Sequence, residues 1–163
     1  MPTPELNLRP QLREWLLNTG SLTERLQALT SHFSLELLGQ REMPMAASEK
    51  RLLLNNEQQL WQIREVLLQG DHKDWVFARS IIPSALCNSK WANLGTQPLG
   101  QRIFNDPSFV RSGFEIGTLK YHPLSGKAFG TNETCWARRS KFMIEQYELI
   151  VAEAFLPNAP CYE

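Results

Sequence analysis

The chain has 163 residues, with 17 basic and 17 acidic side chains and a formal net charge of zero. This length suits one domain with a substantial core, and a content of 42% hydrophobic and 21% charged residues excludes global disorder. The neutral balance argues against non-specific binding of nucleic acid. We expect a single domain over 1–163 that binds an anion only where a few arginines gather locally.

Targeting, redox and metal-binding motifs are absent from the sequence. No apolar run approaches the roughly 20 residues of a membrane span, and residues 1–10, which hold three prolines, indicate an N-terminal arm rather than a signal peptide. Three widely spaced cysteines, Cys87, Cys135 and Cys161, fit free thiols in a reducing cytoplasm. No CxxC, HExxH, GxGxxG or P-loop pattern occurs, so no zinc site or nucleotide cofactor is expected.

Two short helices are predicted near the N-terminus. Apolar residues recur at helical spacing from Gln11 to about Thr30, with a break around Gly20. Gly20 suits the C-terminal end of the first helix. Ser21, with Glu24 three residues later, has the capping-box pattern that begins a second helix.

The rest of the chain is dominated by strand patterns. Residues 33–39 predict a strand followed by a mobile loop at 40–50, and residues 60–68 and 75–82 flank a short Gly/Asp loop typical of an antiparallel hairpin that Pro83 ends. Further strands are expected at 112–121, 135–144 and 148–156, and short helices at 89–94 and 99–104. These patterns predict an α+β domain built on a mainly antiparallel sheet.

One glutamate lies on an apolar strand face. Strand alternation places Glu153 between Val151 and Phe155, and an unpaired buried carboxylate would cost several kcal/mol or more. Glu153 is therefore either a structural ion-pair partner of an arginine on a neighbouring strand or a carboxylate that faces a ligand cavity. The sequence gives these two readings about equal weight.

Arginines on the other strands raise the same question. Arg79 shares a face with Phe77, Arg64 shares one with apolar residues, and the consecutive Arg138 and Arg139 must point to opposite faces. A single arginine of this kind most often extends its charged end to solvent. Several of them beside a core glutamate favour an anion-binding cavity, because the guanidinium group binds a carboxylate bidentately.

The sequence resembles the bacterial chorismate–pyruvate lyases over nearly its whole length. Seven short blocks follow the order of the family: EWLLNTGSLTERL (14–26), LWQIREVLL (60–68), WVFARSIIP (75–83), LGTQPLGQRIF (94–104), FEIG (114–117), WARRS (136–140) and AEAFLP (152–157). The resemblance implies an antiparallel sheet of about six strands, with helices and flaps covering an internal ligand site. It also implies conversion of chorismate to 4-hydroxybenzoate and pyruvate for ubiquinone biosynthesis, with no cofactor.

The resemblance assigns roles to individual residues. Arg64 would bind the carboxylate of the aromatic product and Glu153 its hydroxyl group, so these two are the expected catalytic residues. The backbone N–H groups of Leu22 and Leu99 would also bind the carboxylate. Leu22 stands where the family is associated with Met, a change that a backbone contact survives. Arg79 is expected near the site.

Two mechanisms and two functions are open at this level. Glu153 would act as a general base on the ring C4 proton, or would only orient the 4-hydroxyl while the hydrogen moves within the substrate. We also expect a monomeric cytoplasmic enzyme with small-molecule partners, no nucleic acid and no stable membrane insertion. The alternative is a non-catalytic sensing domain of the UTRA type, which has a similar fold and would bind an aromatic or sugar-like anion. The lack of a helix-turn-helix segment before the first helix argues against it.

Overall fold

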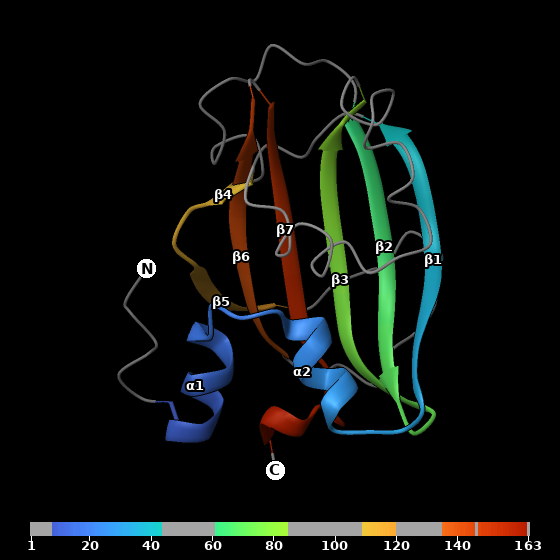
Figure 1. Cartoon of the computed structure of the whole chain (residues 1–163), viewed down its shortest axis with the longest axis vertical. Coiled ribbons are helices and arrows are strands. Elements are labelled where there is room, and N and C mark those ends of the chain that lie inside the picture. The colour runs from blue at the N-terminus through green and yellow to red at the C-terminus, as the bar shows by residue number, and fades with distance from the viewer. Residues whose placement is uncertain (1–7, 44–60, 85–108, 120–134, 146, 163) are drawn as a thin grey trace.

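A computed structural model describes residues 8–43, 61–84, 109–119, 135–145 and 147–162. They form one sheet, two short helices and a closing 3₁₀ turn (Figure 1). The helical elements are α1 (Pro10–Leu17), α2 (Leu22–Ala28) and η2 (Pro160–Tyr162). The strands are β1 (Phe33–Met43), β2 (Trp61–Gly70), β3 (Lys73–Pro83), β4 (Val110–Arg111), β5 (Glu115–Leu119), β6 (Cys135–Ile144) and β7 (Tyr147–Phe155).

The sheet is antiparallel throughout its described pairings, in the order β1-β2-β3-β7-β6-β4, with β5 also paired to β6. β1, β2 and β3 are joined in succession, β6 and β7 form a second hairpin, and the pairing of β3 with β7 joins the two groups (Figure 1). The predicted α+β fold is confirmed. The described sheet has seven strands rather than about six, because β4 and β5 pair with different stretches of β6.

Most of the predicted strands are present. The predicted strand at 112–121 is instead two shorter ones, β4 and β5, and β1 is longer than predicted because residues 40–43 continue it. The rest of the expected loop at 40–50 and the helices expected at 89–94 and 99–104 lie outside the described residues. So do residues 1–7 of the expected arm, whose last residue, Pro10, begins α1. No helix in the described ranges has the length and apolar character that crossing a membrane requires.

The turn between β2 and β3 shows how local sequence sets the register. Asp71 and His72 have φ angles of 51° and 66°, the left-handed conformation of a type I′ hairpin turn. Beside them, Gly70 packs against Trp75 so closely that a Cβ atom on Gly70 would lie 2.1 Å from the indole ring. A glycine is thus required here, and the predicted hairpin is confirmed.

The connection between α1 and α2 differs from the prediction in one detail. The Ser21 hydroxyl accepts a hydrogen bond from the Glu24 N–H at 3.2 Å, which confirms the predicted N-cap. α1, however, ends at Leu17 with Asn18 as its C-cap in an extended conformation, so the prediction that Gly20 ends the helix is wrong. The Asn18 Oδ1 instead accepts a hydrogen bond from the Gly20 N–H at 2.8 Å and closes the turn.

Both faces of the sheet are packed. The helices lie over one face of the sheet, toward one end (Figure 1), and form a core cluster with it that includes Trp15, Leu26, Val66, Leu68 and Phe155. On the opposite face a separate cluster includes Leu67, Phe77 and Ala154. β7 therefore lies centrally and is apolar on both faces, as its sequence predicts.

Candidate active site

A pocket lies between the α1–α2 connection and the face of the sheet that the helices cover. Two cross-strand rows supply much of its floor: Val66–Ala78–Glu153–Arg138 and Arg64–Ser80–Val151–Ser140. Leu22 and its neighbours at the start of α2 form part of the opposite wall. The charged residues among the described lining are Arg64, Arg111, Arg138 and Glu153.

The pocket is narrow in the described conformation. Its volume is about 40 Å³, enough for a few water molecules.

Arg64 is a buried cation in the floor of the pocket. Its side chain is only 2% exposed, and burial lowers the pKa of its guanidinium because the charged form is desolvated. An arginine still carries its charge at neutral pH under these conditions. A buried guanidinium in a ligand pocket is the group expected to bind a carboxylate bidentately.

Glu153 combines both readings that the sequence allows. Its side chain is 14% exposed and lines the pocket, and its Oε1 accepts a hydrogen bond from the Nε of Arg138 at 3.1 Å. Arg138 belongs to the neighbouring strand β6 and is only 3% exposed. Glu153 is therefore an ion-pair partner and, at the same time, a carboxylate of the pocket lining.

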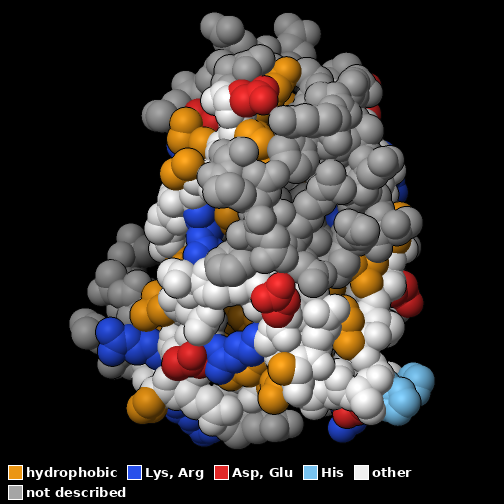
Figure 2. Space-filling model, in the orientation of Figure 1, with side chains coloured by type: hydrophobic (Ala, Val, Ile, Leu, Met, Phe, Trp, Pro, Cys, Tyr) orange, Lys and Arg blue, Asp and Glu red, His pale blue; other side chains and the backbone are white. Residues whose placement is uncertain are grey.

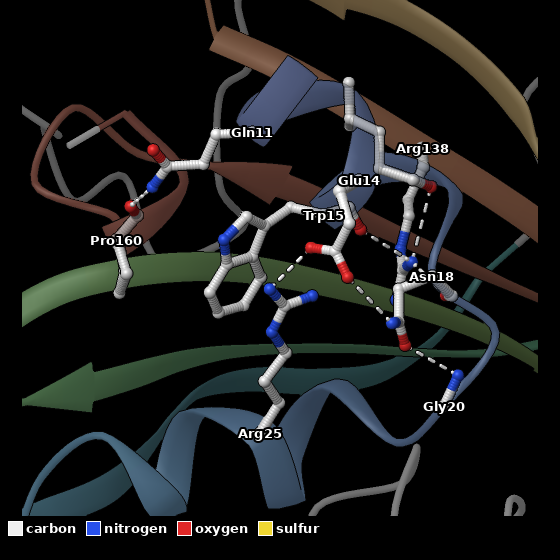
Figure 3. A network of polar contacts seen from close by, with 9 residues as sticks. Gln11, Glu14, Trp15, Asn18, Gly20, Arg25, Arg138 and Pro160 are labelled. Carbon is white, nitrogen blue, oxygen red and sulfur yellow. Dashed lines mark hydrogen bonds and ion pairs between the residues drawn. The ribbon is translucent and has the colours of Figure 1, made fainter. Parts of the chain in front are cut away.

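Arg138 also binds the end of helix α1 (Figure 3). Its Nη1 donates to the carbonyl oxygens of Asn18 at 2.8 Å, Trp15 at 3.3 Å and Leu16 at 3.4 Å. The last carbonyls of a helix lack partners within the helix and carry partial negative charge, so a cation is stabilising there. Arg138 thus fixes Glu153 and the α1–α2 connection to each other.

The α1–α2 connection is held on its outer side as well. Arg25 of α2 forms an ion pair with Glu14 of α1, and its guanidinium lies 3.4 Å from the centre of the Trp15 ring (Figure 3). The ion pair lowers the pKa of the Glu14 carboxyl group. Basic and acidic side chains lie close together at the end of the molecule where the two helices cover the sheet (Figure 2).

The predicted site residues divide into three groups. The structure brings Leu22, Arg64 and Glu153 to one pocket, whereas Leu99 lies outside the described residues. Arg79 forms an ion pair with Glu65 at 2.7 Å and is not among the described residues that line this pocket. A role for Arg79 near the site stays a prediction.

The expectation that one of two consecutive arginines faces inward is confirmed. Arg138 faces the pocket, and Arg139 forms an ion pair with Glu115 at 2.8 Å. Arg111 was missed, because its two-residue strand β4 shows no alternation from which a face could be predicted. In the described ranges, no group of three or more His, Cys, Asp or Glu side chains could hold a metal ion, and Cys135 and Cys161 are free thiols.

The architecture defines a class of α+β domains that share this antiparallel sheet, and solved structures of the class are similar to this chain. The effector domain of PhnF from Mycobacterium smegmatis has a TM-score of 0.58 at 10% identity, over 87% of this chain and 91% of that one. The C-terminal domain of the histidine utilization repressor from Pseudomonas syringae pv. tomato has a TM-score of 0.55 at 9% identity, over 78% and 92%. At these identities the likeness shows the fold alone.

Sequence similarity defines the family. The chorismate lyase family profile matches residues 2–163. A protein of Pseudoalteromonas atlantica named "Probable chorismate pyruvate-lyase" is 44% identical over 93% of this chain and 82% of its own length. One of the same name from Idiomarina loihiensis is 37% identical over 99% and 86%. The chain belongs to the chorismate lyase family, which confirms the resemblance seen in the sequence.

Proposed function

We propose that this protein is a chorismate pyruvate-lyase and that the pocket under the α1–α2 connection is its active site. The observation that carries the proposal is a pocket with a buried arginine, Arg64, and an ion-paired glutamate, Glu153, in a chain of the chorismate lyase family. The substrate is a dianion with a ring carboxylate, a 4-hydroxyl group and an enolpyruvyl side chain. Arginines and a carboxylate are complementary to these groups.

The reaction is an elimination that makes the ring aromatic. The bond between ring C3 and the enolpyruvyl oxygen breaks, C4 loses its hydrogen, and the side-chain methylene gains a hydrogen to become the methyl group of pyruvate. Atoms balance between chorismate on one side and 4-hydroxybenzoate plus pyruvate on the other, without water, oxidant or reductant. The protein's task is therefore to orient the substrate and to balance the charge that moves between the ring and the leaving group.

Arg64 and Glu153 divide this task in our proposal. Arg64 holds the ring carboxylate, with help from the backbone N–H of Leu22. Glu153 meets the 4-hydroxyl, held in place by Arg138. From there Glu153 either removes the C4 proton as a general base or orients the hydroxyl while the hydrogen moves within the substrate.

A turnover assay tests the proposal directly. Purified protein is mixed with chorismate, 4-hydroxybenzoate is followed by its absorbance, and pyruvate by coupling to lactate dehydrogenase. We expect the two products in equal amounts. Binding of chorismate without formation of either product would favour the alternative, a sensing domain. This alternative is considered because domains of transcription regulators have a similar fold.

The wider setting is part of the same proposal. We infer a monomer in the cytoplasm that supplies 4-hydroxybenzoate to ubiquinone synthesis. Gel filtration of the purified protein tests the monomer. Restoration of ubiquinone in a bacterial strain that lacks chorismate lyase tests the pathway, and a strain left without ubiquinone by an active, expressed protein would contradict it.

A further inference from the structure

Arg111 is a cation in the pocket wall for which the roles proposed so far give no function. It lies on β4, opposite Phe142 of β6, and lines the same pocket as Arg64 of β2. β3, β7 and β6 separate β4 from β2 in the sheet. Arg111 and Arg64 therefore approach the pocket from opposite flanks.

The Arg111 side chain is held in place but retains donors. Its Nη2 donates to the Thr19 carbonyl at 2.7 Å, and its guanidinium lies 4.6 Å from the centre of the Phe114 ring and 5.7 Å from that of Phe142. A guanidinium carries several N–H donors in a rigid plane. Within the described part of the chain, the Thr19 carbonyl is the one hydrogen-bond acceptor that Arg111 has.

Arg138 is engaged more fully. Its Nε is bound to Glu153 and its Nη1 to three backbone carbonyls of the α1 end. Arg138 is thus committed to protein partners, and of the two arginines on this side of the pocket it is the less able to bind a ligand.

The charge of the pocket also points to a ligand near Arg111. The described lining holds three guanidinium groups and one carboxylate, an excess of two positive charges in a chain whose formal net charge is zero. Burial lowers the pKa of Arg111, the nearby positive charge of Arg138 lowers it further, and Glu153 opposes both. An anion bound beside Arg111 would relieve the repulsion between the two cations.

We propose that Arg111 binds the carboxylate of the enolpyruvyl group, the part of the substrate that leaves as pyruvate. This inference rests on the proposed function, in which Arg64 binds the ring carboxylate. The two arginines then hold the two carboxylates of one dianion from opposite flanks of the pocket. Since 4-hydroxybenzoate has no enolpyruvyl carboxylate, Arg111 distinguishes the substrate from this product, whereas Arg64 binds both.

The experiment compares substrate and product in the variants Arg111→Gln and Arg64→Gln. We expect Arg111→Gln to raise the KM for chorismate by about 10–100-fold and to change the Kd for 4-hydroxybenzoate by less than about threefold. Arg64→Gln should weaken both. Arg111→Lys, which keeps the charge, should recover part of the loss. Arg139→Gln, on the opposite face, is the matched control and should change neither value.

With an active wild-type protein, two outcomes would overturn the proposal. One is an Arg111→Gln protein whose chorismate KM is unchanged, and the other is equal weakening of substrate and product, which indicates a general structural role. If the wild-type protein binds chorismate without turnover, the proposed function fails but the same comparison is made with Kd values for chorismate and 4-hydroxybenzoate. A wild-type protein that binds neither would overturn both proposals.

Discussion

The two faces of the sheet carry their charges differently. On the face away from the helices, each of three cations has an acidic partner within the sheet: Arg79 with Glu65, Arg139 with Glu115 and Lys141 with Glu148. On the helix-covered face, the described lining of the pocket holds three arginines and one carboxylate, Glu153. The first face is balanced by these ion pairs, whereas the described lining of the pocket has more guanidinium groups than carboxylates.

The difference arises between residues that are adjacent in the sequence. Arg64 faces the pocket and Glu65 the opposite side, and the same holds for Arg138 and Arg139. Each is a charged residue within an apolar strand, so composition alone does not separate them. What separates them is the face of the sheet to which each side chain points, and an excess of one charge across several strands on the same face is the better indicator of a ligand site.

The largest effect is expected at Glu153. If the carboxylate removes the C4 proton, Glu153→Gln should lower turnover by about 10²–10⁴-fold, the usual contribution of a general base. If it orients the hydroxyl, Gln should keep most of the activity and Ala should lose much more. Steady-state kinetics of both variants distinguish these routes. Full activity in both variants would mean that Glu153 has no part in the reaction and serves only as an ion-pair partner, like the glutamates on the opposite face.

Arg64→Ala should have the next largest effect. Truncation of a buried arginine that binds a carboxylate costs about 2–5 kcal/mol of binding free energy, so the affinities for chorismate and for 4-hydroxybenzoate should both fall. Calorimetric titration measures them, with circular dichroism to confirm the fold. Near-normal affinity for both ligands in a folded Arg64→Ala variant would show that Arg64 does not bind the carboxylate.

Glu65→Gln tests the balanced face. Glu65 is 1% exposed and its partner Arg79 is 23% exposed, so loss of the pair should lower the free energy of unfolding by about 1–3 kcal/mol, less than for a fully buried pair. Denaturant titration measures this change. Affinity for 4-hydroxybenzoate should stay within about twofold of wild type. A large loss of affinity with unchanged stability would instead connect this pair to the site.

The smallest effect concerns the two described cysteines, one in the core of each face. Cys161 belongs to the helix-side cluster and Cys135 to the opposite one. Burial raises the pKa of Cys161 to about 12, so at pH 8 its thiol is protonated and unreactive. Iodoacetamide should label neither cysteine in the native protein and both in denaturant, as mass spectrometry would show. Rapid labelling of one of these cysteines in the native protein would indicate that the core on its face of the sheet is the more accessible to reagent.

The sequence predicted the parts of the molecule that depend on periodicity and local chemistry. The N-cap at Ser21 and the hairpin turn at Asp71 follow from near neighbours, and both are present. The family resemblance selected Leu22, Arg64 and Glu153, which share one pocket. Arg111 could not be selected, because its position depends on the pairing of a very short strand with β6, a distant segment.

The pairing of β3 with β7 has a consequence for how the protein folds. β1, β2 and β3 form local pairings, and so do β6 and β7, but Val76–Ile81 must find Ile150–Phe155 at the far end of the chain. Contacts between distant segments carry a loop-closure entropy and form slowly. Arg64, on β2, lies on one side of the β3–β7 pairing, and Glu153, on β7, lies on the other. A partly folded chain in which β3 and β7 are not yet paired would therefore lack the assembled pocket. A ligand that contacts residues on both sides of this pairing would slow the separation of β3 from β7 and protect these strands from hydrogen exchange.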